Sequence, residues 1–354
     1  MTVHDPHMAA VSRTKSAIPD DAAMLRAAAD LTRELSTAQA SIYWPDLLVS
    51  ALVGYAALAG AILTQGAPMV AFGLVAMLAL YRAASFIHEL THIRKGALPG
   101  FRFGWNLIVG IPLMIPSFMY EDVHTQHHAR TRYGTANDPE YLPLALMKPW
   151  SLPLFILVAA LAPVGLILRF GVLTPLSLLF PPLRRKVVAE FSALSINPAY
   201  RRRAPEGAFA RAWAWQEAGA CIFALALVGS VFVLGWKPLL TYMAVHSAMT
   251  VINQLRTLVA HLWENEGDAM TVTAQYLDSV NVPPPSPFAE IWAPVGLRYH
   301  ALHHLLPSVP YHALGEAHKR LATTLAADSP YHRGNYPGMW PLVGKIARST
   351  MVRR

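Results

Sequence analysis

The sequence contains few charged residues and almost no cysteine. Asp, Glu, Lys and Arg make up 14% of the 354 residues, and hydrophobic residues make up 54%. A soluble domain carries about 25% charged residues, so this deficit predicts a protein embedded in a membrane. The single cysteine, Cys221, lies in an apolar stretch. A disulfide framework, a cysteine-ligated zinc site and an iron–sulfur cluster are therefore excluded.

The chain is basic, with a net charge of +8, which on its own is compatible with nucleic-acid binding. The basic residues, however, stand in short clusters beside apolar runs, for example at 184–186 and 201–203. Such clusters are typical of the cytoplasmic loops of membrane proteins. We therefore expect no nucleic-acid partner and a multi-pass protein of the bacterial inner membrane.

Two pairs of long apolar runs predict two transmembrane helical hairpins. Residues 47–64 and 69–87 flank a short Gln-Gly-Ala-Pro break, and residues 214–234 and 238–260 flank a Gly-Trp-Lys turn. Each run is close to the roughly 20 residues that cross a bilayer as a helix. The predicted fold is an all-α integral membrane protein with about four spanning helices and additional interfacial helices.

Two further apolar segments are interrupted. Residues 105–119 are short and contain two prolines, which predicts an interfacial or re-entrant segment. Residues 151–180 contain three prolines and Arg169, and either a bent hairpin or an interfacial segment fits them. Either a substrate channel or the interfacial aromatic belt fits three tryptophans, and the belt is expected, namely for Trp105, Trp263 and Trp292.

These features divide the chain into three parts. We expect a polar N-terminal tail or interfacial helix, a membrane domain and a basic C-terminal tail, at 1–44, 45–320 and 321–354. Because two hairpins return the chain to its starting side, both termini and a histidine-rich cap are expected on one face of the membrane. The charge bias predicts that this face is cytoplasmic.

Nine of the 15 histidines form a pattern. They occur as H-E-L-T-H at 88–92, as H-T-Q-H-H at 124–128 and as H-A-L-H-H at 300–304, while His261 stands alone at the end of an apolar run. Residues i, i+3 and i+4 share one face of a helix, so each motif aims its imidazoles in one direction. Nine imidazoles are too many for one metal ion and suit two. The predicted metal-binding residues are His88, His92, His124, His127, His128, His261, His300, His303 and His304.

The ligand type narrows the chemistry. Imidazole suits zinc, copper, iron and nickel, but structural zinc closes at four ligands. Many neutral histidines with positions left open suit a redox metal that activates O₂. A membrane location makes a lipid chain the natural source of an unactivated C–H bond. The residues alone thus predict a lipid-modifying, O₂-activating metalloenzyme.

Two other functions, a zinc protease and a metal carrier, fit parts of this pattern. The motif at 88–92 also fits the H-E-x-x-H pattern of zinc proteases, in which Glu89 would be the general base. That hypothesis leaves the other seven histidines of the pattern without a role. A metal carrier would need metal-binding histidines inside the spanning segments, whereas these lie at the ends of the segments.

At these histidines the sequence resembles the membrane fatty acid desaturase superfamily, whose members carry three histidine boxes. The boxes H-x(3–4)-H, H-x(2–3)-H-H and H-x(2–3)-H-H match 88–92, 124–128 and 300–304 in order. The stretches R-T-L-V-A-H at 256–261 and L-D-S-V-N-V at 277–282 also look like its bacterial fatty-acyl members. The resemblance implies two iron ions, held by the eight box histidines and His261, with O₂ as co-substrate.

The resemblance also bears on the surroundings of the irons. Some members place an Asn one helical turn before the extra histidine, where this chain has Thr257, and the nearest candidate is Asn253. Acidic residues near the boxes are candidates to orient the ligands, namely Glu89, Glu121, Asp138 and Glu140. The H-P-G-G haem motif of fused cytochrome b5 domains does not occur. Electrons are therefore expected from a separate ferredoxin, or from cytochrome b5 with its reductase.

The resemblance is compatible with two reactions. The first is desaturation of an acyl-lipid chain. The alternative is hydroxylation or ketolation of a lipid, alkane or carotenoid, since H-E-L-T-H resembles the first box of membrane alkane hydroxylases. The second box, H-T-Q-H-H, does not match the form found in those hydroxylases, and this favours the desaturase.

Overall fold

The computed structural model describes residues 18–94, 96–144 and 147–351. Residues 1–17 of the expected N-terminal tail lie outside the described residues. Within the described ranges the chain is helical, and it forms isolated β-bridges but no strand. The all-α prediction is therefore confirmed.

The first predicted hairpin consists of α3 (Ala40–Leu63) and α4 (Gly66–His92). The break falls at Thr64 and Gln65, after which Gly66 has a φ of +63°, a value that favours glycine. The two helices pack closely because Gly54 has no side chain: a Cβ there would lie 2.6 Å from Leu80. The outer faces carry exposed apolar side chains such as Leu52, which suits contact with lipid.

The second predicted hairpin consists of α11 (Gly207–Gly229), α12 (Val231–Leu234) and α13 (Trp236–Leu258). Among the described residues, four helical stretches are long and apolar enough to cross a membrane, and they run Ala40–Leu63, Gly66–His92, Ala162–Leu179 and Gly207–Leu234. The predicted number of four is confirmed, but α13 is not one of them. It carries polar residues along its length and packs against α3, α4, α7 and α8, so the other helices surround it.

The interrupted segment after 150 supplies the apolar stretch Ala162–Leu179. Its elements are α7 (Ser151–Ala160), α8 (Ala162–Ile167), the π-helical η5 (Leu168–Leu173), α9 (Thr174–Leu179) and α10 (Pro181–Glu190). Arg169 is tolerated here because it is buried and paired: its Nη2 lies 2.7 Å from Glu217 Oε1. The same carboxylate binds Arg184 at 2.7 Å.

The segment predicted to be interfacial is short and broken. It contains α5 (Phe101–Trp105), the π-helical η2 (Asn106–Gly110) and the 3₁₀ turn η3 (Ser117–Met119), and it leads into α6 (Val123–His127). The aromatic-belt prediction is wrong, because Trp105 and Trp263 are fully buried and Trp292 is 9% exposed. The indole N–H groups of Trp105 and Trp263 donate to the carbonyls of Ala83 and Leu258, so these rings belong to the core.

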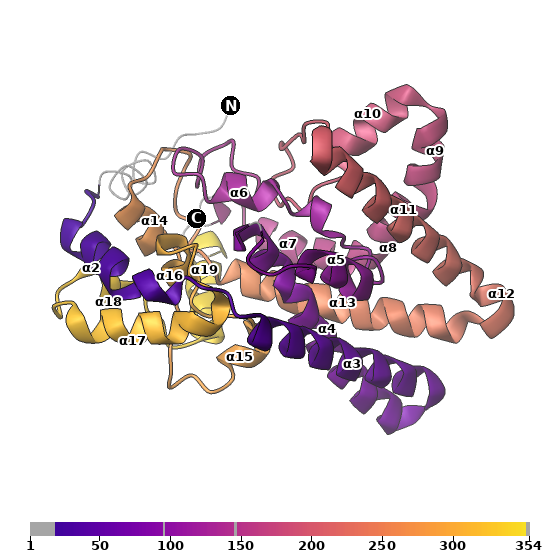
Figure 1. The fold of residues 1–354 in the computed structure, drawn as a ribbon, viewed down its shortest axis with the longest axis horizontal. Helices are drawn as coiled ribbons and strands as arrows, with labels where there is room; N and C mark the ends of the chain where they lie inside the picture. The colour runs from indigo at the N-terminus through magenta and orange to yellow at the C-terminus, as the bar shows by residue number, and fades with distance from the viewer. Residues whose placement is uncertain (1–17, 95, 145–146, 352–354) are drawn as a thin grey trace.

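A helical cap covers one end of the spanning helices, at the left in Figure 1, with α12 and the α3–α4 turn at the opposite end. Its elements are α2 (Ala22–Thr32), η1 (Arg33–Leu35), α14 (Val272–Asp278), α15 (Ala289–Trp292), α16 (His300–Leu305), η6 (Tyr311–Ala313), α17 (Leu314–Thr324), α18 (Pro330–Arg333) and α19 (Met339–Met351). The residues expected to form a basic tail are folded into this cap: Tyr331, Leu342 and Ile346 are buried in its hydrophobic clusters.

Candidate metal centre

The cap and the ends of the spanning helices bring the nine predicted histidines together. His88 and His92 occupy the last turns of α4. The second motif lies on α6 and its C-cap residue, His128, and α6 follows η3 in the chain after a short turn. The third motif forms α16. His261 follows α13 and pairs through an isolated antiparallel bridge with Ser279. Segments more than 200 residues apart in sequence thus meet at one site.

The nine side chains divide into two groups, and within each group the ligand atoms lie within 4.8 Å of one another. The first is called here the five-histidine group and contains His88, His92, His124, His128 and His303. The second is called the four-histidine group and contains His127, His261, His300 and His304. All nine predicted residues are brought together, and they form two clusters rather than one.

The two groups divide each H-x-x-H-H motif in the same way. His124 and His128 are four residues apart and stay in one group, as do His300 and His304. The middle histidine of each motif, His127 or His303 at position i+3, joins the other group. Each H-x-x-H-H helix therefore serves both groups, with the i and i+4 residues in one and the i+3 residue in the other.

The ring nitrogens converge at short distances. The Nε2 atoms of His124 and His128 are 3.0 Å apart, and those of His92 and His303 are 3.1 Å apart. In the four-histidine group, His300 Nε2 lies 3.0 Å from that of His261 and 3.1 Å from that of His304. Convergent lone pairs of this kind are the donor set of a metal ion.

Five histidines of the second and third motifs are held neutral. Burial, with a contribution from neighbouring imidazoles, places the pKa of His124, His128 and His303 well below the usual value. The same causes lower the pKa of His300 and His304. Neutral imidazoles keep their lone pairs available, as metal binding requires.

Carboxylates and a tyrosine hold the outer nitrogens of the second motif. Glu140 Oε2 lies 2.5 Å from His124 Nδ1, and the Tyr120 hydroxyl lies 2.8 Å from the same atom. Asp138 lies 2.9 Å from His127 Nδ1 and also accepts the backbone N–H of Gly134. An acceptor at Nδ1 fixes the tautomer that presents Nε2 to the metal.

His127 differs from these histidines because its pKa is raised. Burial lowers the pKa of His127, but the adjacent Asp138 carboxylate raises it by more, so the net shift is upward. Burial also raises the pKa of Glu140 to about 7. Two of the predicted acidic residues thus contact metal-binding candidates directly.

The other predicted neighbours have different partners. Glu89 accepts a hydrogen bond from the Tyr43 hydroxyl and another from the Tyr311 backbone N–H at 3.1 Å through Oε2, while its Oε1 lies 3.8 Å from His88 Nδ1. Asn253 accepts from Arg256 at 3.2 Å, and among the described residues it has no hydrogen bond to a histidine. Glu121 pairs with Arg102.

Sequence reasoning missed the residues that hold His261. The Tyr133 hydroxyl lies 2.8 Å from His261 Nδ1 and donates to Asp278 Oδ2 at 3.0 Å. Tyr141 donates to the same carboxylate oxygen at 2.9 Å. Asp278 lies within the L-D-S-V-N-V stretch, and this stretch was the feature of the sequence that could have identified it. Asn281, in the same stretch, accepts the backbone N–H of Leu302 and so anchors α16.

A metal ion fits each group. The donors are imidazoles, and the carboxylates of Glu140 and Asp138 lie at the outer nitrogens of the second motif. Both ring nitrogens of buried His88 have no hydrogen-bond partner among the described residues, an arrangement that is costly without a ligand. His92, His128 and His304 are partly exposed and the other six are buried.

Comparison with known proteins agrees with this geometry. The family model described as fatty acid desaturase matches residues 65–335. A ceramide hydroxylase of Caulobacter vibrioides (strain NA1000 / CB15N) is similar to the chain, with 49% identity over 331 residues, which are 93% of this chain and 94% of that protein. No solved structure matches. The matched range contains all nine histidines and covers most of the chain, and we conclude that this protein belongs to the fatty acid desaturase family.

Proposed function

We propose that this protein is a di-iron, O₂-dependent hydroxylase of a ceramide-type membrane lipid. The convergence of nine imidazoles in two groups carries the proposal of a two-metal oxidation site. The similarity to a ceramide hydroxylase over nearly the full length of both chains supports hydroxylation, and a ceramide as the lipid. The earlier preference for desaturation rested on the form of one box, which is a weaker guide than similarity along the whole chain.

In this proposal the five-histidine group holds one iron and the four-histidine group the other. Once bound, the irons supply the reduction of O₂ to an oxidant that can attack an unactivated C–H bond. The net reaction converts C–H, O₂, two electrons and two protons into C–OH and water. The electrons come from a separate carrier, a ferredoxin or cytochrome b5 with its reductase.

The side chains position the ligands and exclude water. Asp138 and Tyr133 orient His127 and His261 through their Nδ1 atoms. The buried rings of Trp105 and Trp263 close the core beside the spanning helices. We further propose that the metal centre and both termini face the cytoplasm. A protease-protection experiment that places the C-terminus on the far side of the membrane would contradict this.

Mass spectrometry of the total lipids of a ceramide-producing host tests the reaction. Expression of the chain should yield ceramides heavier by one oxygen, and expression of the His304→Ala variant should not. Ceramides or fatty acyl chains lighter by two hydrogens would instead establish a desaturase. Zinc without iron in protein purified from iron-replete cells would contradict the di-iron site.

A further inference from the structure

Part of the helical cap exposes large apolar side chains. The stretch 283–292, which contains α15, has four prolines, and Glu290 is its one charged residue. Phe288 and Ile291 in this stretch are 68% and 47% exposed. Trp340, in the first turn of α19, is 70% exposed. Apolar side chains that gather on a surface mark a contact with another molecule or with a membrane.

The two stretches lie side by side on the cap. A Cβ added at Gly338 would lie 3.8 Å from Ser286 Oγ, so the chain just before Trp340 passes beside the chain just before Phe288. Beneath them, α15 and α19 bury side chains in one hydrophobic cluster. The exposed apolar residues therefore occupy one region, called here the apolar cap patch, which consists of Pro284, Pro285, Pro287, Phe288, Ile291 and Trp340.

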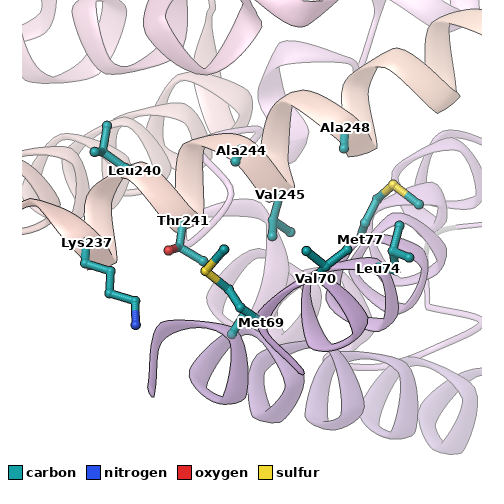
Figure 2. A pocket seen from close by; sticks show the side chains of 12 residues that line it. Met69, Val70, Leu74, Met77, Lys237, Leu240, Thr241, Ala244, Val245 and Ala248 are labelled. Atoms are coloured by element: carbon teal, nitrogen blue, oxygen red, sulfur yellow. The ribbon is translucent and has the colours of Figure 1, made fainter. Parts of the chain in front are cut away.

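The spanning helices show where the hydrocarbon core of the membrane ends on the side away from the cap. Lys237, at the start of α13, donates from Nζ to the Thr64 carbonyl at 2.7 Å, at the turn between α3 and α4. A lysine that places its ammonium group at a helix end beside an apolar surface is typical of a membrane boundary. Figure 2 shows this lysine at one end of a surface to which α4 contributes apolar side chains, namely Met69, Val70, Leu74 and Met77.

The boundary on the cap side lies near Arg82. Its guanidinium donates to the Asp46 carboxylate at 2.6 and 2.7 Å, and its side chain is 35% exposed. Gly66 and Arg82 are 16 residues apart on α4, about 24 Å along the helix. Asp46 and Thr64 are 18 residues apart, about 27 Å along α3. Both lengths are close to the thickness of a hydrocarbon core, about 30 Å. The last turns of α4, which carry His92, therefore stand at the level of the headgroups.

The apolar cap patch is held at this boundary. The hydroxyl of Tyr81, the residue before Arg82, donates to the Trp292 carbonyl at 2.9 Å, and α15 also contacts α13. This bond places α15 beside the point where α4 leaves the hydrocarbon core. Exposed apolar side chains at that level meet lipid headgroups and the first carbons of the acyl chains. A membrane surface therefore accounts for the exposure of Phe288 and Ile291.

The charge of the neighbouring chain fits a membrane surface as well. After Asp328 the sequence contains five basic residues and no acidic one. Lys345 and Arg348 are exposed on α19, the helix that carries Trp340. A helix with an exposed tryptophan and with lysine and arginine on its polar side is typical of helices that lie in the membrane interface. Basic residues at this level are attracted to anionic headgroups.

We infer that the apolar cap patch and α19 anchor the cap in the membrane surface, at the boundary between headgroups and acyl chains, and that the anchor prefers anionic lipids. The anchor is linked to the third histidine motif. The backbone N–H of Val282, just before the patch, donates to the carbonyl of Arg298 at 2.7 Å, and the motif begins two residues later at His300. Anchoring therefore sets the height of this motif above the acyl chains, whichever lipid is oxidised.

Spin labels measure the depth of the patch in a bilayer. A Cys221→Ala background removes the single native cysteine, and Phe288→Cys and Trp340→Cys then each introduce one site for a nitroxide. Leu52→Cys, exposed on α3, is the control for lipid, and Asp328→Cys, exposed between α17 and α18, is the control for water. Each protein is reconstituted into vesicles of phosphatidylcholine and phosphatidylglycerol. Power-saturation EPR then gives the accessibility of each label to oxygen and to a water-soluble nickel chelate.

We expect the labels at Phe288→Cys and Trp340→Cys to be more accessible to oxygen than to nickel, as at Leu52→Cys. The opposite ratio, as at Asp328→Cys, would place the patch in water and overturn the anchor. Low accessibility to both reagents would also overturn it, because protein, such as a second copy of the chain, would then cover the patch. Thermal unfolding of each labelled variant checks that it is folded.

A charge reversal tests the preference for anionic lipids. Lys345→Glu in the Trp340→Cys protein should raise the accessibility of the label to nickel in vesicles that contain phosphatidylglycerol and leave it unchanged in phosphatidylcholine alone. Lys319→Glu, which reverses an exposed lysine of α17, is the matched control and should have no effect in either. A change of equal size in both kinds of vesicle, or in neither, would overturn the preference for anionic lipids.

Discussion

The five-histidine group and the four-histidine group are built differently. The five-histidine group has one donor more than a four-coordinate ion requires, and two of its members, His92 and His128, are partly exposed. The four-histidine group has three buried members, and two of its members, His127 and His261, are held by Asp138 and Tyr133. One group has spare donors, and the other depends on the exact placement of each donor. Removing one histidine should therefore lower the metal content of the two groups unequally.

Removing one ligand from each group gives the largest expected effect. His304→Ala leaves the four-histidine group with three donors, so the purified protein should hold about one metal ion fewer per chain and form no detectable product. His92→Ala leaves four donors in its group and should retain more metal. Metal analysis by mass spectrometry on equal amounts of folded protein makes the measurement. His332→Ala, outside both groups, is the control, and equal metal loss in both ligand variants would contradict the asymmetry.

The next effect concerns the carboxylate behind His127. Asp138→Asn keeps the size of the side chain but presents an N–H group where His127 Nδ1 needs an acceptor, which favours the wrong tautomer. We expect a loss of metal affinity of about 10- to 100-fold, measured by competition with a chelator. Asp268→Asn changes an exposed carboxylate and should leave affinity unchanged. Wild-type affinity in Asp138→Asn would show that the hydrogen bond does not position the ligand.

Two tyrosines on one carboxylate allow a finer comparison. The Tyr133 hydroxyl bonds to both His261 Nδ1 and Asp278, whereas the Tyr141 hydroxyl bonds to Asp278 and the backbone N–H of Asn265, and only its ring packs against His261. Tyr133→Phe should lower metal affinity about tenfold, and Tyr141→Phe should lower it only a few-fold, by about the worth of one hydrogen bond. Chelator competition and thermal unfolding are measured together. Equal losses of affinity would mean that Asp278, rather than the contact with His261, determines the effect.

The same comparison shows what sequence could predict. The candidate ligands could be predicted to lie together because helical spacing is local: residues at i, i+3 and i+4 project from one side of a helix. Asp138 and Glu140 were found because they lie close to the second motif in the chain. The contact of Tyr133 with His261 joins residues 128 positions apart, and no local pattern encodes it. The division into two groups also needed the structure, because it depends on how α6 and α16 face each other.

The membrane part was predictable to a similar degree. Apolar length located the first hairpin, since the break predicted at 65–68 overlaps the observed one at 64–65. The run at 238–260 was predicted to cross the membrane, but α13 is not among the four stretches that are apolar enough, because a helix packed against α3, α4, α7 and α8 can carry polar residues that a lipid-facing helix cannot. The predicted tail at 321–354 failed for a related reason. Its basic residues gave it a polar average, which concealed the apolar face that buries Leu342 and Ile346.

The smallest expected effect is also the one that separates the metal-centre hypothesis from the protease hypothesis. Glu89 lies beside His88, with its Oε1 3.8 Å from His88 Nδ1, but its hydrogen bonds come from the Tyr43 hydroxyl and the backbone of Tyr311. Glu89→Gln keeps an acceptor for both donors, so it should cost about one hydrogen bond's worth of stability, about 1 kcal/mol, and leave metal content unchanged. Thermal unfolding and metal analysis measure the two quantities. A zinc protease would instead lose all activity in this variant, because the carboxylate would be its general base. Full loss of lipid oxidation with metal retained would therefore give Glu89 a role in the reaction that its hydrogen bonds to Tyr43 and Tyr311 do not predict.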